Sequence, residues 1–214
     1  MAKVYGVSAS PFVRKVRVFL EEKGVDYEVD PVFPGSDDES YRRISPTGKI
    51  PSFAEGDLKV PDSSVICAYL ERTRPEPRLY PSQPADFARA LWLEEYADTV
   101  LVGPATVPFF EKVLAPRLYQ RETNEEALAK AVEKDLPPLC DYLQEQLGEA
   151  SYLVGGTFSI ADISVATQFV NLSYGADIDG SRWPRLAAYL EGLFTRPSFK
   201  KLIAEDRKLF ADIA

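Results

Sequence analysis

Residues 3–14 read Lys-Val-Tyr-Gly-Val-Ser-Ala-Ser-Pro-Phe-Val-Arg, and this stretch decides the fold. Its first residues, 3–7, are mostly apolar and predict a short buried strand. Ser10 and Pro11 predict the start of a helix, because serine is a favoured N-cap and proline a favoured first helical residue. Apolar residues then recur at helical spacing as far as Gly24, which is expected to end the helix.

The pattern continues as a small mixed α/β domain. Residues 27–32 predict a second strand, which completes a βαβ unit with parallel strands and a right-handed crossover. A short helical turn follows at 41–44, and residues 50–60 predict a hairpin around Gly56. Residues 62–64 start another helix, so the order βαβ-(α)-ββα predicts a four-stranded mixed sheet with helices packed on it.

A polar, proline-rich segment then separates this domain from a region without strand patterns. We expect a first domain over 1–78, a linker over 79–86 and an all-helical domain over 87–214, so the fold class is α/β plus all-α. The helices expected after the linker are 86–101, 102–119 with interruptions at its prolines, 124–147, 159–173 and 183–213 with a break near Pro197.

The composition excludes several kinds of chemistry. The chain has no histidine, which removes Ser-His-Asp and Cys-His nucleophile systems, histidine bases and histidine-ligated metals. Cys67 and Cys140 are too few for a structural zinc site, and no metal is expected. Two distant cysteines fit the reducing cytoplasm better than a secreted disulfide scaffold.

Charge and hydropathy limit the kinds of partner that the chain is expected to bind. The net charge of −8 argues against nucleic-acid binding. The first 82 residues carry 12 basic and 13 acidic side chains and the rest carry 13 and 20, so an anionic ligand is better tolerated by the first domain. No apolar run is long enough to span a bilayer, and the N-terminus enters a strand directly without a signal-peptide core.

Four short motifs occur in a fixed order along the chain: Ser8-Ala9-Ser10-Pro11-Phe12, Lys49-Ile50-Pro51, Asp62-Ser63, and 155–162 (Gly-Gly-Thr-Phe-Ser-Ile-Ala-Asp). In this order and spacing they resemble the cytosolic glutathione transferase family, in particular its serine-type classes (theta, phi, tau and zeta) in a bacterial-type form. The resemblance covers essentially the whole chain. It implies a thioredoxin-like domain that binds glutathione, a helical domain that forms the electrophile pocket, and a cytoplasmic homodimer active in detoxification.

By its place before Pro-Phe-x-x-Arg, Ser10 matches the family's catalytic serine, and Ser8 is the second candidate. A thiol with a pKa of about 8.5 is mostly protonated at neutral pH, whereas the thiolate is the nucleophile. A hydrogen bond from the Ser10 hydroxyl to the sulfur is worth about 1.5–3 kcal/mol, which lowers the thiol pKa by about one to two units. Outside this context, Ser10 would be an ordinary N-cap.

The other glutathione contacts of the family fall on two of these motifs. Lys49, Ile50 and Pro51 match a loop before a cis-proline, in which the backbone of Ile50 pairs with the cysteinyl part of the tripeptide and Lys49 lies nearby. Ser63 would hold the γ-glutamyl carboxylate at a helix N-terminus, and Asp62 would face the ammonium group. Glu is common in the family where Asp62 stands, so the side chain is one methylene shorter here.

The remaining assignments are less specific. Residues 155–162 resemble the family's capping box and hydrophobic staple, a structural feature. The aromatic and aliphatic candidates for the electrophile pocket, any of which is by base rate more often a core residue, are Phe12, Val107, Phe109, Phe110 and Tyr119. Phe12 is also assigned to the glutathione site.

The resemblance implies transfer of glutathione to small hydrophobic electrophiles. One alternative is a specialised glutathione-dependent isomerase, dehalogenase or peroxidase, although the Ser-Ser-Cys signature of zeta-like isomerases is absent. A second alternative is a non-catalytic binding protein of the same fold. Such proteins often lose the serine or the acidic-Ser pair, and this chain retains both.

Overall fold

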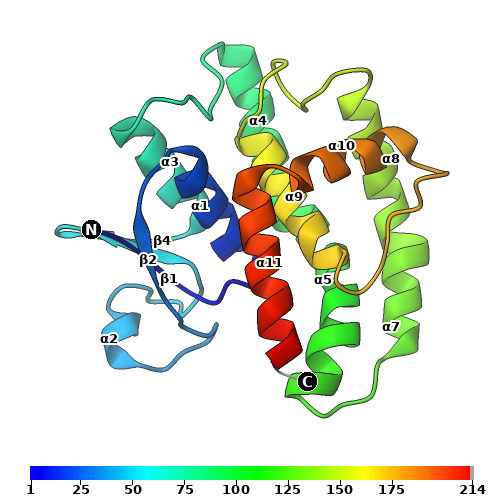
Figure 1. Ribbon diagram of the computed structural model, residues 1–214, viewed down its shortest axis with the longest axis horizontal. Coiled ribbons are helices and arrows are strands. Elements are labelled where there is room, and N and C mark those ends of the chain that lie inside the picture. The colour runs from blue at the N-terminus through cyan, green and yellow to red at the C-terminus, as the bar shows by residue number, and fades with distance from the viewer. Residues whose placement is uncertain (213–214) are drawn as a thin grey trace. The chain divides into compact units, whose positions relative to one another are not determined.

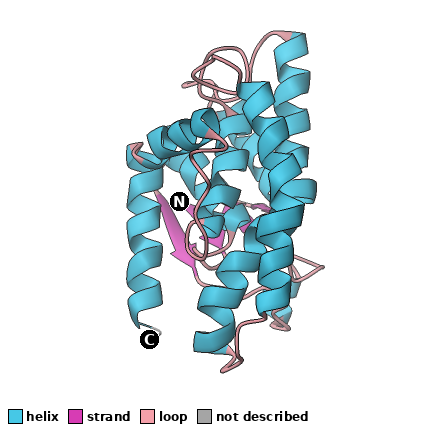
Figure 2. Cartoon of the chain, turned by 90° about the vertical axis from the view of Figure 1, so that its right-hand side faces the viewer, coloured by secondary structure: helices cyan, strands magenta, loops and turns pink. Residues whose placement is uncertain are grey.

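The computed structural model describes residues 1–212, which form two compact units, one from Met1 to Tyr80 and one that begins at Pro81 (Figure 1). Within the described residues, every strand belongs to the first unit, and the second consists of helices and loops (Figure 2). The last residue of the helix expected over 183–213 lies outside the described part of the chain.

The sheet of the first unit has the expected mixed topology. Its strands are β1 (Ala2–Tyr5), β2 (Tyr27–Asp30), β3 (Ser52–Glu55) and β4 (Leu58–Pro61), in the order β2-β1-β3-β4. β1 is parallel to β2 and antiparallel to β3, and β3 and β4 form an antiparallel hairpin. β1 ends earlier than expected because the chain turns at Gly6, where φ is +142°, a value that L side chains rarely adopt.

Three helices accompany this sheet: α1 (Pro11–Glu22), α2 (Glu39–Arg42) and α3 (Ser63–Thr73). Figure 1 shows α1 and α3 together above the sheet and α2 below it. α2 starts earlier than the turn expected at 41–44, because the Asp38 side chain accepts a hydrogen bond from the N–H of Tyr41 at 3.0 Å and caps the helix there.

The strand register brings the three motifs of the first unit to one edge of the sheet. Tyr5, the last residue of β1, pairs with Ser52, the first residue of β3, and Ser52 pairs with Pro61, the last residue of β4. The segment that leads to α1, the loop before β3 and the start of α3 therefore all leave the sheet at the same edge.

The second unit is built from eight α-helices within the described residues: α4 (Pro84–Tyr96), α5 (Val102–Phe109), α6 (Ala115–Leu118), α7 (Glu125–Lys130), α8 (Leu136–Leu147), α9 (Ile160–Leu172), α10 (Pro184–Phe194) and α11 (Pro197–Asp212). α4 starts at Pro84, two residues before the helix that the sequence predicted, with proline at its first position. The expected break before Pro197 is present, between α10 and α11.

Prolines inside the second unit widen its helices rather than ending them. The π-helical segments η1 (Ala97–Leu101), η2 (Phe110–Leu114) and η3 (Ala131–Asp135) each end two or three residues before a proline. A proline ring clashes with the carbonyl four residues earlier, and a π-turn supplies the extra space. The chain therefore stays helical from α4 to α6, where the sequence predicted interruptions.

α9 is the central helix of this unit and is buried along its whole length. Its start is fixed by Asp162, whose carboxylate accepts hydrogen bonds from the N–H groups of Ser159 at 2.8 Å and Leu153 at 2.9 Å and from the Tyr189 hydroxyl at 2.6 Å. Burial raises the pKa of the Asp162 carboxyl, against the effect of these donors. The capping box predicted at 155–162 is thus confirmed as structural.

The loop after α9 approaches α5 closely at Gly175. A Cβ atom on Gly175 would lie 2.1 Å from the carbonyl oxygen of Pro108. Only a residue without a side chain fits this contact between two backbone segments.

Candidate functional site

Gly6 is the point at which the start of α1 meets the loop before β3. A Cβ atom on this glycine would lie 2.5 Å from Cγ2 of Val13 and 3.2 Å from Cβ of Ile50. The absence of a side chain therefore lets the first turn of α1 and the Ile50 loop approach the end of β1 together.

Ser10 is the N-cap of α1 and is half-buried. Its Oγ accepts a long hydrogen bond of 3.4 Å from the N–H of Val13. A serine hydroxyl can accept and donate at once, and the Ser10 proton has no acceptor among residues 1–212. The donor of the Ser10 hydroxyl is therefore available at the positive end of the α1 helix dipole.

The loop before β3 presents an unpaired backbone donor and acceptor. The peptide bond between Ile50 and Pro51 is cis. Neither the N–H nor the C=O of Ile50 has a hydrogen-bond partner in the described chain, although the residue is 9% exposed. Backbone groups that are largely buried are nearly always paired. A donor and an acceptor on one residue suit a ligand that itself carries a peptide bond.

The start of α3 is a second place with unpaired groups. Asp62 has a φ of +79°, an uncommon value for a residue with a side chain, and its N–H donates to the Pro51 carbonyl at 3.2 Å. One oxygen of its carboxylate caps α3 by accepting from the N–H groups of Ser64 and Val65 at 3.0 and 3.1 Å. The N–H and hydroxyl of Ser63 have no partner within residues 1–212 and suit a carboxylate.

A lysine ties the two helix starts together. Lys15 extends from α1, and its ammonium donates to the Ser64 hydroxyl at the start of α3 at 2.9 Å. Together with the Asp62–Pro51 bond, this contact joins α1, the cis-proline loop and α3 around one edge of the sheet. Lys49, the remaining candidate of the loop, has an exposed side chain.

Comparisons with known proteins show the family of the chain. The family model for the glutathione S-transferase N-terminal domain matches residues 4–78, and that for the C-terminal domain matches residues 108–206. Glutathione S-transferase 4 of Zea mays is 33% identical over 218 residues, which cover 94% of this chain and 91% of that protein. The chain belongs to the glutathione S-transferase family.

Solved structures agree with this family assignment. A glutathione S-transferase from Rhodospirillum rubrum F11 superimposes with a TM-score of 0.83 at 29% identity, over 94% of this chain and 91% of that one. A theta-class enzyme from Xanthomonas axonopodis pv. citri, solved with glutathione bound, gives a TM-score of 0.82 at 26% identity, over 94% and 96%. The predicted fold, a thioredoxin-like domain followed by an all-helical one, is confirmed.

The residues that the sequence assigned to an electrophile pocket fall into different environments. Phe109 is 2% exposed, and its ring packs on those of Tyr174 and Phe210 at centroid distances of 5.6 and 5.2 Å, so it is a core residue of the second unit. Phe110 and Tyr119 pack on each other at 5.7 Å, and Tyr119 is 63% exposed. Val107 and Phe12 are half-buried.

The loop after α6 is anchored to Glu111. Its carboxylate accepts hydrogen bonds from the N–H of Asn124 at 2.8 Å and from the Arg121 guanidinium at 2.7 Å. The Asn124 N–H above all, and then Arg121, hold the pKa of the Glu111 carboxyl below its usual range. The hydrogen bonds of Glu111 to Asn124 and Arg121 hold the segment after Tyr119 in place.

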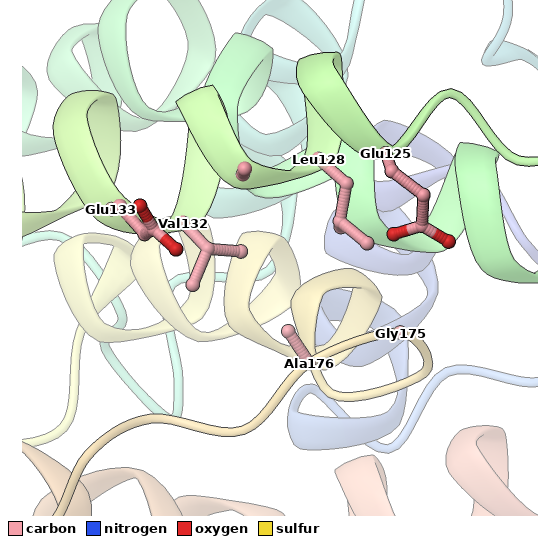
Figure 3. Close-up of a pocket in the computed structure, with 7 residues that line it drawn as sticks. Glu125, Leu128, Val132, Glu133, Gly175 and Ala176 are labelled. Atoms are coloured by element: carbon pink, nitrogen blue, oxygen red, sulfur yellow. The ribbon is translucent and has the colours of Figure 1, made fainter.

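The second unit also has a shallow groove of about 320 Å³ (Figure 3). Its lining residues are Glu125, Leu128, Ala129, Val132, Glu133, Gly175 and Ala176. Figure 3 shows Leu128 and Val132 extending toward the loop that carries Ala176, with Glu125 and Glu133 at opposite ends. None of the candidate site residues lines this groove.

In the described residues, no group of three or more histidine, cysteine or acidic side chains is placed to hold a metal ion. None of the described helices is both long and apolar enough to cross a membrane.

Three residues that shape the loop before β3 were not found from the sequence. Gly6 makes room for Ile50, and the hydroxyls of Tyr41 and Ser45 both donate to the carbonyl of Lys49. A glycine inside a predicted strand, such as Gly6, indicates a bend or a close approach of another segment. The two hydroxyls gave no such signal, because their partner is a backbone atom whose place depends on the closed loop.

Proposed function

We propose that this protein is a glutathione transferase that joins the thiolate of bound glutathione to small hydrophobic electrophiles. The observation that supports it is the group of unpaired donors and acceptors at one edge of the sheet. These are the hydroxyl of Ser10, the N–H and C=O of Ile50, and the N–H and hydroxyl of Ser63. Each of them corresponds to one part of the tripeptide.

Glutathione binding follows from matching these groups to the ligand. The cysteinyl residue pairs in the manner of a β-strand with the N–H and C=O of Ile50. The γ-glutamyl carboxylate lies at the start of α3, where Ser63 and the helix dipole favour an anion. The Asp62 oxygen that does not cap α3 faces the ammonium group, so capping and ligand binding are compatible. Phe12, Lys49 and cis-Pro51 complete the site.

Catalysis is activation of the thiol by Ser10. Its hydroxyl donates to the sulfur and stabilises the thiolate, and the thiol proton passes to solvent. The thiolate then attacks an electrophilic carbon, a carbon–sulfur bond forms, and the leaving group departs with its electron pair. Holding the two reactants together supplies the rest of the acceleration.

The assignment of domains and partners is part of the same proposal. Residues 1–78 hold glutathione, residues 79–86 link the domains, and residues 87–214 supply the electrophile pocket, with Val107, Phe110 and Tyr119 as its candidate lining.

A homodimer in the cytoplasm is expected from the family. One exposed face of α4 carries Phe87, Leu91 and Trp92, apolar residues of the kind found at interfaces.

The test combines binding and turnover. The purified chain is applied to immobilised glutathione, eluted with free glutathione, and assayed with chlorodinitrobenzene and a panel of other apolar electrophiles. Retention with conjugation of at least one electrophile is expected. Retention without any turnover would replace the proposal with a non-catalytic glutathione-binding protein, and the absence of both would refute it.

A further inference from the structure

We propose that Tyr41 and Ser45 are positioning residues for glutathione: their hydroxyls hold the Lys49–Ile50 peptide plane so that the N–H of Ile50 points at the cysteinyl carbonyl. This inference rests on the proposed glutathione site. Neither side chain is required to touch the ligand, because both act through the carbonyl oxygen of Lys49.

Two donors converge on that oxygen. The Tyr41 hydroxyl donates to it at 2.7 Å and the Ser45 hydroxyl at 2.8 Å. The Tyr41 oxygen also lies 3.1 Å from Oγ of Ser52, which acts as the donor because the Tyr41 proton is already used. Tyr41 is 4% exposed, and Ser45 and Ser52 are fully buried. Both lone pairs of the Lys49 carbonyl are thus occupied inside the domain.

The effect on Ile50 follows from the planarity of the peptide bond. The carbonyl of Lys49 and the N–H of Ile50 belong to the same peptide unit and point in opposite directions across it. Fixing the carbonyl oxygen therefore fixes the direction of the N–H, which has no partner within the described chain. Two donors on the carbonyl also polarise the unit and strengthen the N–H as a donor, by an amount on the order of 10–30% per bond.

The network is itself held in place from two sides. Tyr41 belongs to α2, where the Asp38 side chain caps its N–H at 3.0 Å. Arg42, the next residue, donates to the carbonyls of Ser36 at 2.7 Å and Pro46 at 3.2 Å, which fixes the loops on both sides of α2. Ser52 is the first residue of β3. The hydroxyls thus connect α2 and the sheet to the Lys49–Ile50 peptide unit, whose N–H binds the ligand in this proposal.

The inference predicts a split between binding and turnover. In Tyr41→Phe the ring keeps its packing on Tyr5, at 6.1 Å between centroids, while one of the two donors is lost. The Ile50 N–H then loses its fixed direction and with it a hydrogen bond to the ligand, and loss of one neutral hydrogen bond corresponds to about a 2- to 12-fold weaker affinity. We expect the KM and Kd for glutathione to rise by this factor. kcat at saturating glutathione and the pKa of the bound thiol stay unchanged, because Ser10 is untouched.

Matched variants separate positioning from general loosening of the fold. Ser45→Ala is expected to weaken binding as Tyr41→Phe does, and Ser45→Thr, which keeps the hydroxyl, is expected to restore it. Tyr69→Phe is the control, because the Tyr69 hydroxyl donates to Glu55 at 3.0 Å, away from the loop. Its glutathione affinity is expected to equal that of the wild type.

The experiment measures glutathione binding by calorimetry, steady-state kinetics against glutathione, and thermal unfolding for each variant. If Tyr41→Phe does not fold, Ser45→Ala carries the same test. Unchanged affinity in a folded Tyr41→Phe or Ser45→Ala variant overturns this inference and leaves the proposed function standing, as does a fall in kcat with unchanged KM. Failure of the wild type to bind glutathione at millimolar concentration overturns both.

Discussion

Replacing Ser10 with alanine removes the one hydroxyl that the proposed mechanism requires. The expected loss is a charge-assisted hydrogen bond of about 1.5–3 kcal/mol, which corresponds to a rise of about one to two units in the pKa of the bound thiol. At a pH below both values, the thiolate fraction, and with it kcat, falls about 10- to 100-fold. The cost in stability is at most about 1 kcal/mol, because the capping bond to Val13 is long at 3.4 Å.

The assay is the ultraviolet absorbance of the thiolate in the enzyme–glutathione complex, titrated against pH, together with the pH profile of kcat. Ser8→Ala is the first control and should leave both curves in place. Asn124→Ala is the second, because it removes a cap of similar kind, at 3.0 Å on α7, and should lower stability without moving the thiol pKa. A shift in the Ser10→Ala complex of less than about 0.3 unit, or about 0.4 kcal/mol, would refute the role of Ser10.

Three further predictions concern the stability of the fold and the accessibility of its cysteines. Gly175→Ala should lower the free energy of unfolding by about 1–3 kcal/mol, because its Cβ would lie 2.1 Å from the α5 backbone, whereas Gly192→Ala, with open space in α10, should be neutral or stabilising in the same thermal unfolding assay. Because the pKa of the Glu111 carboxyl is lowered in the folded state, its contribution to stability is present above about pH 4.3 and is lost as the pH falls through the folded-state pKa. Glu111→Gln should therefore be less stable than the wild type at pH 7 and lose less free energy of unfolding as the pH is lowered. An equal dependence of the free energy of unfolding on pH in the two proteins, measured by urea unfolding, would contradict this. Cys67 and Cys140 are both buried, and burial raises the pKa of the Cys140 thiol to about 12. A thiol reagent at pH 8 should therefore label neither cysteine in the native chain and both after denaturation.

Local signals in the sequence were sufficient for most of the fold. Ser10-Pro11 located the start of α1 and Asp62-Ser63 the start of α3, because caps and first-turn prolines act within a few residues. Pro51 marked the loop before β3. The prolines of α5 and α6 misled the prediction, since they were expected to interrupt the helix and π-turns absorb them instead. Such accommodation depends on packing that no single segment encodes.

The candidate site could be predicted only in part. Ser10, Ile50 and Ser63 were found through short motifs, and the structure brings their segments to one sheet edge. Phe109, in contrast, was assigned to the pocket although it packs in the core, because aromatic residues on one helix look alike in sequence. Tyr41 could not be found at all, since its acceptor is a backbone oxygen eight residues away in a folded loop.

A crystal structure of the chain with glutathione tests the central claim most directly. The account predicts the cysteinyl N–H and C=O within about 2.7–3.2 Å of the C=O and N–H of Ile50, with the sulfur beside the Ser10 hydroxyl and the γ-glutamyl carboxylate at Ser63. Glutathione bound elsewhere, or no tripeptide at this sheet edge after soaking at millimolar concentration, would contradict it.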